Sequence, residues 1–373
     1  MIKINQNGPP TLSENAMVSP TLVFFLIHSM QIGVGILGFQ RYISMDAGYD
    51  AWVSILVSGI FMHILLWMIY QILQDSQGDI VSVHNEIYGK YIGSFLSFVL
   101  SIYYLLLSLT VLRTFIEVLQ VWIFPRMNIW IFSFLFLLLA YYFASGGFRV
   151  VAGICLISVI LGLPIMVLFF YAIQYGHVEN LFPIVNHSLL EILNATKTAT
   201  LSFLGIELLL VYYPFIKKPE SSKKWAHHGL FLTTMIYLGT ALVSFIYFSE
   251  KGIQNVIWPT LSLWKMVELP FVERFEYLGI GMWVYVILPN ICLALWTASR
   301  IPKRIFNIKQ KWVLIVYFAF LFLASILLKS REMIDMLNDW AGKIGFYILL
   351  YIPVLFVLQK ISQRVRNRYA KSN

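Results

Sequence analysis

Charged side chains are scarce in this chain, where aspartate, glutamate, lysine and arginine together make up 12% of 373 residues. A soluble domain of this size needs a more polar surface, so the shortage excludes an ordinary soluble globular protein. Only two cysteines occur, Cys155 and Cys292, and both lie within apolar runs, which indicates free thiols rather than a disulfide framework. The sequence has no Walker loop, nucleophile elbow or zinc-protease motif, and its histidines lack metal-ligand spacing. It therefore gives no support for an enzyme, a catalytic residue, a cofactor or a metal.

Apolar residues are abundant, at 59% of the chain, and the mean hydropathy is +0.77. They gather in runs of about 20 residues, the length that a helix needs to cross a bilayer. The sequence therefore predicts an all-α integral membrane protein with about ten transmembrane helices. The ten runs are residues 19–39, 51–73, 95–123, 128–145, 149–173, 197–213, 226–249, 275–297, 312–328 and 340–360.

No linker in the sequence separates domains. We expect a single permease-like transmembrane domain over residues 19–360, made of two repeats at about 19–173 and 197–360. A cytoplasmic N-terminal segment, residues 1–18, precedes the domain, and a basic cytoplasmic tail, residues 361–373, follows it.

Basic residues are distributed unevenly between the two predicted sides of the membrane. With ten spans, 17 of the 27 lysines and arginines fall on the side that holds both termini, which the positive-inside rule identifies as the cytoplasm. The basic tail is explained as an anchor that fixes the orientation of the protein in the membrane. Nothing beyond its charge supports contact with nucleic acid. The 17 residues are Lys3, Lys90, Arg149, Lys217, Lys218, Lys223, Lys224, Arg300, Lys303, Arg304, Lys309, Lys311, Lys360, Arg364, Arg366, Arg368 and Lys371.

The first apolar run contains glycines in its middle, where a helix tolerates them poorly. An opened turn frees N–H and C=O groups that lipid cannot satisfy, so those groups must face protein, water or a ligand. Close helix packing on small residues is the alternative explanation. The residues expected to contact a ligand here are Gly33, Val34, Gly35 and Ile36.

The sixth run carries a similar interruption and adds a carboxylate, which is costly inside a bilayer. Glu207 could take a proton, a cation or a substrate amine, or it could cap the second half-helix. The residues expected to contact a ligand here are Phe203, Leu204, Gly205, Ile206 and Glu207.

Interruptions five spans apart are typical of a five-plus-five inverted-repeat permease whose first and sixth helices are broken. In that architecture, helix N-termini favour a carboxylate and exposed carbonyls favour an amine or a cation. The pattern therefore predicts a site for a zwitterionic amino acid or another small polar solute near the middle of the membrane.

Two charges lie in the third run. Arg113 and Glu117 are four residues apart, share one helix face and could pair. We expect either a neutralised structural pair or a gate.

A short segment after the seventh run begins Trp258-Pro259 and continues with apolar residues at three-residue spacing. It predicts a short interfacial helix, with Trp258 and Trp264 in the headgroup region. This helix would be either an ordinary connector or a lid over the site.

Four stretches resemble the B subunit of bacterial spore germination receptors, a group within the amino acid–polyamine–organocation superfamily. The resemblance covers the chain from about Val18 to the last span, and one departure is Gln40, where such proteins commonly have proline. The four stretches are Gln31-Ile32-Gly33-Val34-Gly35-Ile36-Leu37, Ala47-Gly48-Tyr49-Asp50-Ala51-Trp52, Tyr88-Gly89-Lys90-Tyr91-Ile92-Gly93, and Pro259-Thr260 through Glu273-Arg274-Phe275-Glu276.

The resemblance implies a nutrient-sensing subunit in the spore inner membrane, with an A-type membrane subunit and a C-type lipoprotein as partners. Two function classes stay open, because a receptor that signals and a transporter that moves its solute use the same fold. A scaffold with a vestigial site is a third.

Overall fold

The computed structural model describes residues 13–372 except 77, 184–185 and 271, with side chains as far as residue 364. Most of the predicted N-terminal segment and the side chains of the end of the basic tail therefore lie outside the described residues. The described chain is helical and also contains two isolated β-bridges. Its α-helices are α1 (Leu22–Gln31), α2 (Phe39–Ala47), α3 (Ala51–Ser76), α4 (Ile80–Tyr88), α5 (Lys90–Trp122), α6 (Ile129–Ser145), α7 (Phe148–Val167), α8 (Leu189–Leu201), α9 (Leu209–Tyr212), α10 (Lys223–Tyr247), α11 (Glu250–Asn255), α12 (Pro259–Trp264), α13 (Phe275–Phe306), α14 (Gln310–Leu327) and α15 (Arg331–Ser372).

Seven of the described helical segments are long and apolar enough to cross a membrane, and a bent pair that includes α8 would make eight. α1 and α6 are shorter apolar helices. Each apolar run of the sequence overlaps at least one helix, which confirms the all-α membrane class. Ten crossings in an inverted repeat remain a prediction.

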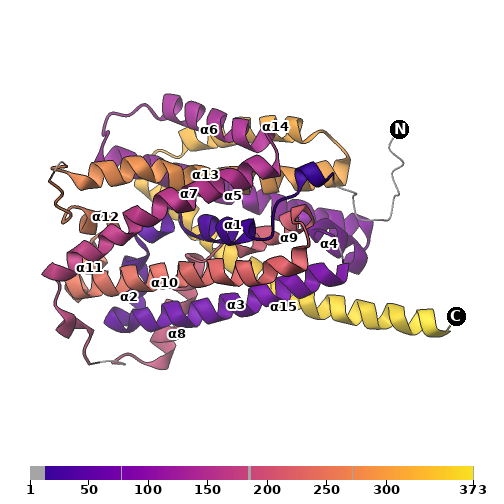
Figure 1. Cartoon of the computed structure of the whole chain (residues 1–373), viewed down its shortest axis with the longest axis horizontal. Helices are drawn as coiled ribbons and strands as arrows, with labels where there is room; N and C mark the ends of the chain where they lie inside the picture. The colour runs from indigo at the N-terminus through magenta and orange to yellow at the C-terminus, as the bar shows by residue number, and fades with distance from the viewer. Residues whose placement is uncertain (1–12, 77, 184–185, 271, 373) are drawn as a thin grey trace.

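α1 lies in the middle of the bundle, with α7 and α13 on one side and α10 on the other (Figure 1). Seven of its ten residues are apolar and form no separate polar face with the other three, and its last turn, which holds the polar His28, Ser29 and Gln31, is buried. A helix with no polar face is stable only when protein or lipid surrounds it. The composition of α1 thus explains its central position, which makes it the element around which a site can form.

Both predicted interruptions are present. The first break (Ile32–Gly38) separates α1 from α2 and contains only one 3₁₀ turn. The second break (Ser202–Gly205) follows α8, and the chain then turns by 49° into a short helical segment, Ile206–Phe215. Gly205 has a φ of +127°, in a region that favours glycine.

The described start of the chain and the end of α15 lie at the same end of the bundle, which we call the terminal end (Figure 1). There Val18 forms a parallel bridge with Ile216. The Val18 N–H donates to the Phe215 carbonyl over 2.8 Å, and the Lys217 N–H donates to the Val18 carbonyl over 2.9 Å. This terminal strap ties the residues before the first broken span to the residues after the second.

Candidate functional site

The first break frees backbone carbonyls that an unbroken helix would have paired, and α13 supplies donors for three of them. Asn290 Nδ2 donates to the Ser29 carbonyl and, over 3.3 Å, to the Ile32 carbonyl. Trp283 Nε1 donates to the Gly33 carbonyl over 3.3 Å. Because buried carbonyls need such partners, two polar side chains of α13 hold the opened backbone in place.

Donors on α10 and α12 satisfy two further carbonyls at this break. The Tyr237 hydroxyl donates to the Gln31 carbonyl over 3.0 Å. The Thr260 hydroxyl donates over 2.7 Å to the Ile36 carbonyl and accepts from Gln40 Nε2 over 2.7 Å. Of the three expected partners for the opened backbone, which were protein, water or a ligand, these carbonyls have protein.

The second break is closed by Glu207, which is fully buried. One carboxylate oxygen accepts from the Gly205 N–H over 2.8 Å, and the other accepts from the Tyr103 hydroxyl over 2.9 Å. The Tyr104 hydroxyl donates to the Glu207 backbone carbonyl over 2.8 Å. Each side-chain oxygen of Glu207 thus receives a neutral donor, an arrangement that supports the capping role over the ligand role.

The two breaks are in direct contact. Gln31 Nε2, at the end of α1, donates to the Phe203 carbonyl of the second break over 2.8 Å. A Cβ added at Gly205 would lie 2.6 Å from Met30 Cγ, so no side chain fits between the two backbones there. Residues 172 positions apart in sequence therefore form one unit, as the paired interruptions predict.

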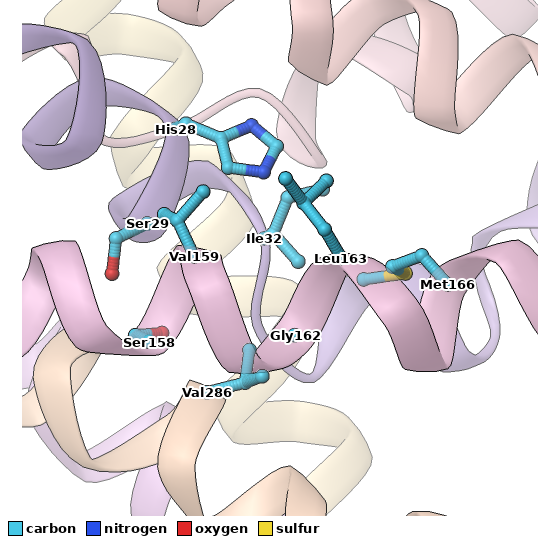
Figure 2. Close-up of a pocket in the computed structure, with 9 residues that line it drawn as sticks. All are labelled: His28, Ser29, Ile32, Ser158, Val159, Gly162, Leu163, Met166 and Val286. Atoms are coloured by element: carbon cyan, nitrogen blue, oxygen red, sulfur yellow. The ribbon is translucent and has the colours of Figure 1, made fainter.

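A small cavity lies beside the first break. This cavity of about 10 Å³ lies where α1, α7 and α13 meet, which is room for about one water molecule (Figure 2). Within the first break, whose residues are all described, Gly35 is exposed and the others are buried. The cavity is lined by His28, Ser29, Ile32, Ser158, Val159, Gly162, Leu163, Met166 and Val286.

The nine residues predicted to contact a ligand lie together around the contact between the breaks, but most are covered by protein. Gly35 is exposed and Leu204 is partly exposed. The buried ones are Gly33, Val34, Ile36, Phe203, Gly205, Ile206 and Glu207.

Arg113 and Glu117, which the sequence places on one helix face, each have a hydrogen-bond or ion-pair partner on another element. Arg113 Nε donates to the Leu328 carbonyl over 2.5 Å and its Nη2 to the Lys329 carbonyl over 3.4 Å, at the end of α14. Glu117 forms its ion pair with Arg331 of α15 over 2.7 Å. Helical spacing places the first two side chains on one face, but neighbouring helices offer both of them better partners.

Arg331 links three elements at the end of the bundle opposite the terminal end. It pairs with Glu117 of α5, pairs with Asp335 over 2.7 Å, and lies 5.5 Å from the ring centroid of Trp258, beside α12. The cation paired with Glu117 is therefore Arg331, which helical spacing within α5 does not predict.

Replacing Arg331 by methionine is expected to lower the thermal stability of the purified protein more than replacing Glu117 by glutamine does. The first change leaves a carboxylate that is 7% exposed without its cation, which costs about 2–3 kcal/mol after allowance for the partial exposure of Arg331. The second change leaves Arg331 paired with Asp335. Melting temperatures in detergent check this order, and equal shifts would contradict the ion-pair assignment.

The expected short helix is present as α12, but Trp258, just before it, and Trp264, at its end, are both buried in protein. Trp264 is fully buried; its ring stacks on Phe169 with centroids 5.1 Å apart and meets Trp283 edge to face with centroids 5.4 Å apart. Through Trp283 and Thr260, α12 contacts the carbonyls of the first break. This coupling to the site favours the lid over the connector.

The residues that hold the breaks in place gave only a weak signal in the sequence. A polar side chain within an apolar run was the available signal, since such residues are costly in lipid and face the protein interior. Asn290 is an example, because it sits in the run at 275–297. The residues missed were Tyr103, Tyr104, Tyr237, Thr260, Trp283 and Asn290.

The comparisons of this sequence with known proteins agree on one family. The family model described as "Spore germination protein" matches residues 17–334. Spore germination protein GerQB of Bacillus cereus is 45% identical over 350 residues, which are 94% of this chain and 97% of that protein. Spore germination protein YndE of Bacillus subtilis (strain 168) is 23% identical over 354 residues, which cover 93% of this chain and 97% of YndE.

Two solved structures share the fold at low sequence identity. MhsT in complex with L-phenylalanine has a TM-score of 0.65 at 14% identity and covers 92% of this chain and 88% of MhsT. A Na⁺-coupled sialic acid symporter in a substrate-bound outward-open state has a TM-score of 0.66 at 12% identity and covers 90% of this chain and 79% of the symporter. At these identities the likeness shows the fold alone.

Proposed function

This chain belongs to the family of spore germination proteins, and on that basis we propose that it is the nutrient-sensing subunit of a spore germination receptor. It binds a small polar solute, an amino acid, between the two broken spans and signals to partner subunits. It is not an enzyme, it needs no cofactor, and it does not bind nucleic acid.

The observation that carries the proposal is the contact between the two breaks, with Gly35 exposed beside it. Two buried side-chain oxygens at this place, Gln31 Oε1 and Asn290 Oδ1, have no hydrogen-bond partner within the described residues. An ammonium group brings three donors and would satisfy such acceptors. These acceptors, together with the freed backbone of both breaks, support an amino acid as the ligand class.

Binding requires this arrangement to open, because seven of the nine predicted contact residues are buried. A ligand that binds the open arrangement shifts the population toward it, by as much as its affinities for the two arrangements differ. Because α12 contacts the first break and Arg331, opening would move α12 relative to α15. This is the movement that we propose partner subunits detect.

The family and the placement of charge support a specific setting for the protein. It lies in the spore inner membrane, with the terminal end on the cytoplasmic side, as the excess of basic residues there indicates. Its partners are the A-type membrane subunit and the C-type lipoprotein of the receptor. The crossing number is ten, with α1 and α2 as the halves of the first broken span.

Amino-acid transport is the second candidate, and one observation favours it. A solved protein of the same fold was captured with L-phenylalanine, so this fold can hold an amino acid. Uptake of labelled amino acids into vesicles that contain this chain alone separates the two candidates. Accumulation would favour the transporter, and binding without accumulation would favour the receptor.

Replacing Gly35 by leucine is expected to raise the half-maximal germinant concentration at least about tenfold, or roughly 1.4 kcal/mol, at normal protein abundance. A leucine would fill the space beside the exposed turn, where the ligand enters. Alanine should change the response by less than about twofold, because its Cβ would lie 3.7 Å from the Tyr237 hydroxyl, an ordinary contact. Germination dose–response with immunoblotting measures both variants.

Gly281 offers a matched control, since it is exposed on α13 and a Cβ there meets nothing within 4 Å. Gly281→Leu adds the same side chain away from the breaks and should leave the half-maximal concentration unchanged. If Gly35→Leu responds like the wild type at equal abundance, the ligand binds elsewhere.

A further inference from the structure

Asn290 occupies an unusual position for a neutral side chain. It is 1% exposed, on α13, and its amide nitrogen donates to the carbonyls of Ser29 and Ile32. These carbonyls belong to the last turn of α1 and to the start of the first break. The C-terminal end of a helix carries partial negative charge, so the amide nitrogen lies where the local potential favours a positive group.

A monovalent cation would suit the same position. In membrane transporters built from broken helices, unwound carbonyls and half-helix C-terminal ends coordinate Na⁺ or bind protons. Hard cations take oxygen ligands, and two carbonyls three residues apart supply the beginning of such a set. The two amide hydrogens of Asn290 satisfy those oxygens instead, one for each carbonyl.

The neighbouring carbonyls of the first break also receive neutral donors. The Gln31 carbonyl accepts from the Tyr237 hydroxyl, and the Gly33 carbonyl accepts from Trp283 Nε1. An ion that entered here would have to displace donors from two helices. The protein therefore supplies from its own side chains the stabilisation that a cation gives to opened backbone.

We propose that the Asn290 amide takes the place of a bound monovalent cation, so that the first break is held without Na⁺ or K⁺. This inference rests on the proposed function, in which the breaks form the binding site, and it assigns to that site an ion-independent mode of binding. In this proposal the amide nitrogen of Asn290 positions the backbone of the first break, whereas its Oδ1 is the acceptor that the proposed function assigns to the ligand.

Thermal unfolding of the purified wild-type chain, with no germinant present, tests the proposal directly. Melting temperatures are measured in sodium chloride, potassium chloride and choline chloride at equal ionic strength. The expected difference among the three salts is below about 1 °C. A saturable rise of the wild-type melting temperature with Na⁺ or K⁺ would overturn the proposal.

Replacing Asn290 by aspartate is expected to make the melting temperature depend on Na⁺. The aspartate carboxylate would face the Ser29 and Ile32 carbonyls with no donor between, so the variant should melt below the wild type in choline chloride. A cation can then bind among these oxygens, and Na⁺ should raise the melting temperature by about 3 °C or more in a saturable way. No Na⁺ response in folded Asn290→Asp would contradict the placement of Asn290 on a cation position.

Asn255→Asp is the matched control, because Asn255 is exposed on α11 and its amide also donates to a backbone carbonyl, that of Lys251. It should behave like the wild type in all three salts. If Asn290→Asp does not fold, Asn290→Ala replaces it, since loss of the amide frees the same two carbonyls for Na⁺.

Germination assays on spores test the same ion independence in the intact receptor complex. With a mixture of the twenty L-amino acids as the probe, wild-type germination should be equal in sodium and choline buffers. Different results would contradict the proposed function and the proposed ion independence. A Na⁺-dependent melting temperature overturns ion independence alone, and a normal dose–response in Gly35→Leu spores overturns the binding site alone.

Discussion

Spores that carry Gly205→Ala are expected to lose their germination response, and the variant protein to be less stable in the membrane. A φ of +127° suits glycine, and holding another residue there costs on the order of 1–3 kcal/mol. The added Cβ would also lie 2.6 Å from Met30 Cγ of α1, and overpacking of that kind costs a similar amount, about 1–3 kcal/mol. The two broken spans would be forced apart at their point of contact. Germination assays, immunoblots and melting temperatures of the purified variant measure the effect.

Gly35→Ala is the control for this change, because it adds the same methyl group to a break at a place with space for it. It should keep both response and abundance. A Gly205→Ala variant with normal stability and response would show that the second break relaxes away from α1, and the close contact between the breaks would then not be required.

Glu207→Leu is expected to abolish the response and to reduce the amount of folded protein strongly. It removes the acceptor for the buried Gly205 N–H and the buried Tyr103 O–H, and each unpaired buried group costs about 1–3 kcal/mol. Glu207→Gln should be tolerated, because its oxygen can accept from the Gly205 N–H while its amide donates to the Tyr103 hydroxyl oxygen. Membrane abundance and dose–response for the two variants measure the difference.

The glutamine variant decides between the two roles of Glu207 that the sequence leaves open. Retained response shows that the side chain acts as a hydrogen-bonding cap. Lost response at normal abundance would show that the negative charge itself is needed, for a proton, a cation or the amine of the ligand.

Features that depend on local sequence were predictable. Glycine inside an apolar run marks a place where a helix opens, whatever surrounds it, and both breaks lie where Gly33 and Gly205 predict them. The short helix α12 follows from a proline at its first turn. The membrane class follows from composition alone, because run length and hydropathy need no knowledge of packing.

Features that depend on partners distant in sequence were not predictable from spacing. The rule that opposite charges four residues apart can pair applies within one helix. The partner of Glu117 is Arg331, which is 214 residues away and on another helix. Likewise, an aromatic residue near a span end suits an interface equally well whether or not protein covers it. Trp264 is covered by α13 and the segment after α7.

The positions at which the backbone opens in the candidate site were predictable, but the side chains that surround them were not. Opened carbonyls could be inferred from the glycines, but which side chains satisfy them depends on how α10, α12 and α13 pack around α1. Asn290, Tyr237 and Thr260 gave only the weak signal of a polar residue near or within an apolar run.

The donors that hold the first break have a consequence for how the protein is made. They lie 206 to 261 residues further along the chain than the carbonyls that they satisfy. Synthesis runs from the N-terminus at about 5–20 residues per second, so α1 enters the membrane well before any of these side chains exists. During that interval its opened turn must be hydrated in the insertion machinery or remain helical, and the break takes its final form only when α10 to α13 arrive. Assembly of the binding site is thus a late step of biogenesis, and a chain truncated before α13 has no means of completing it.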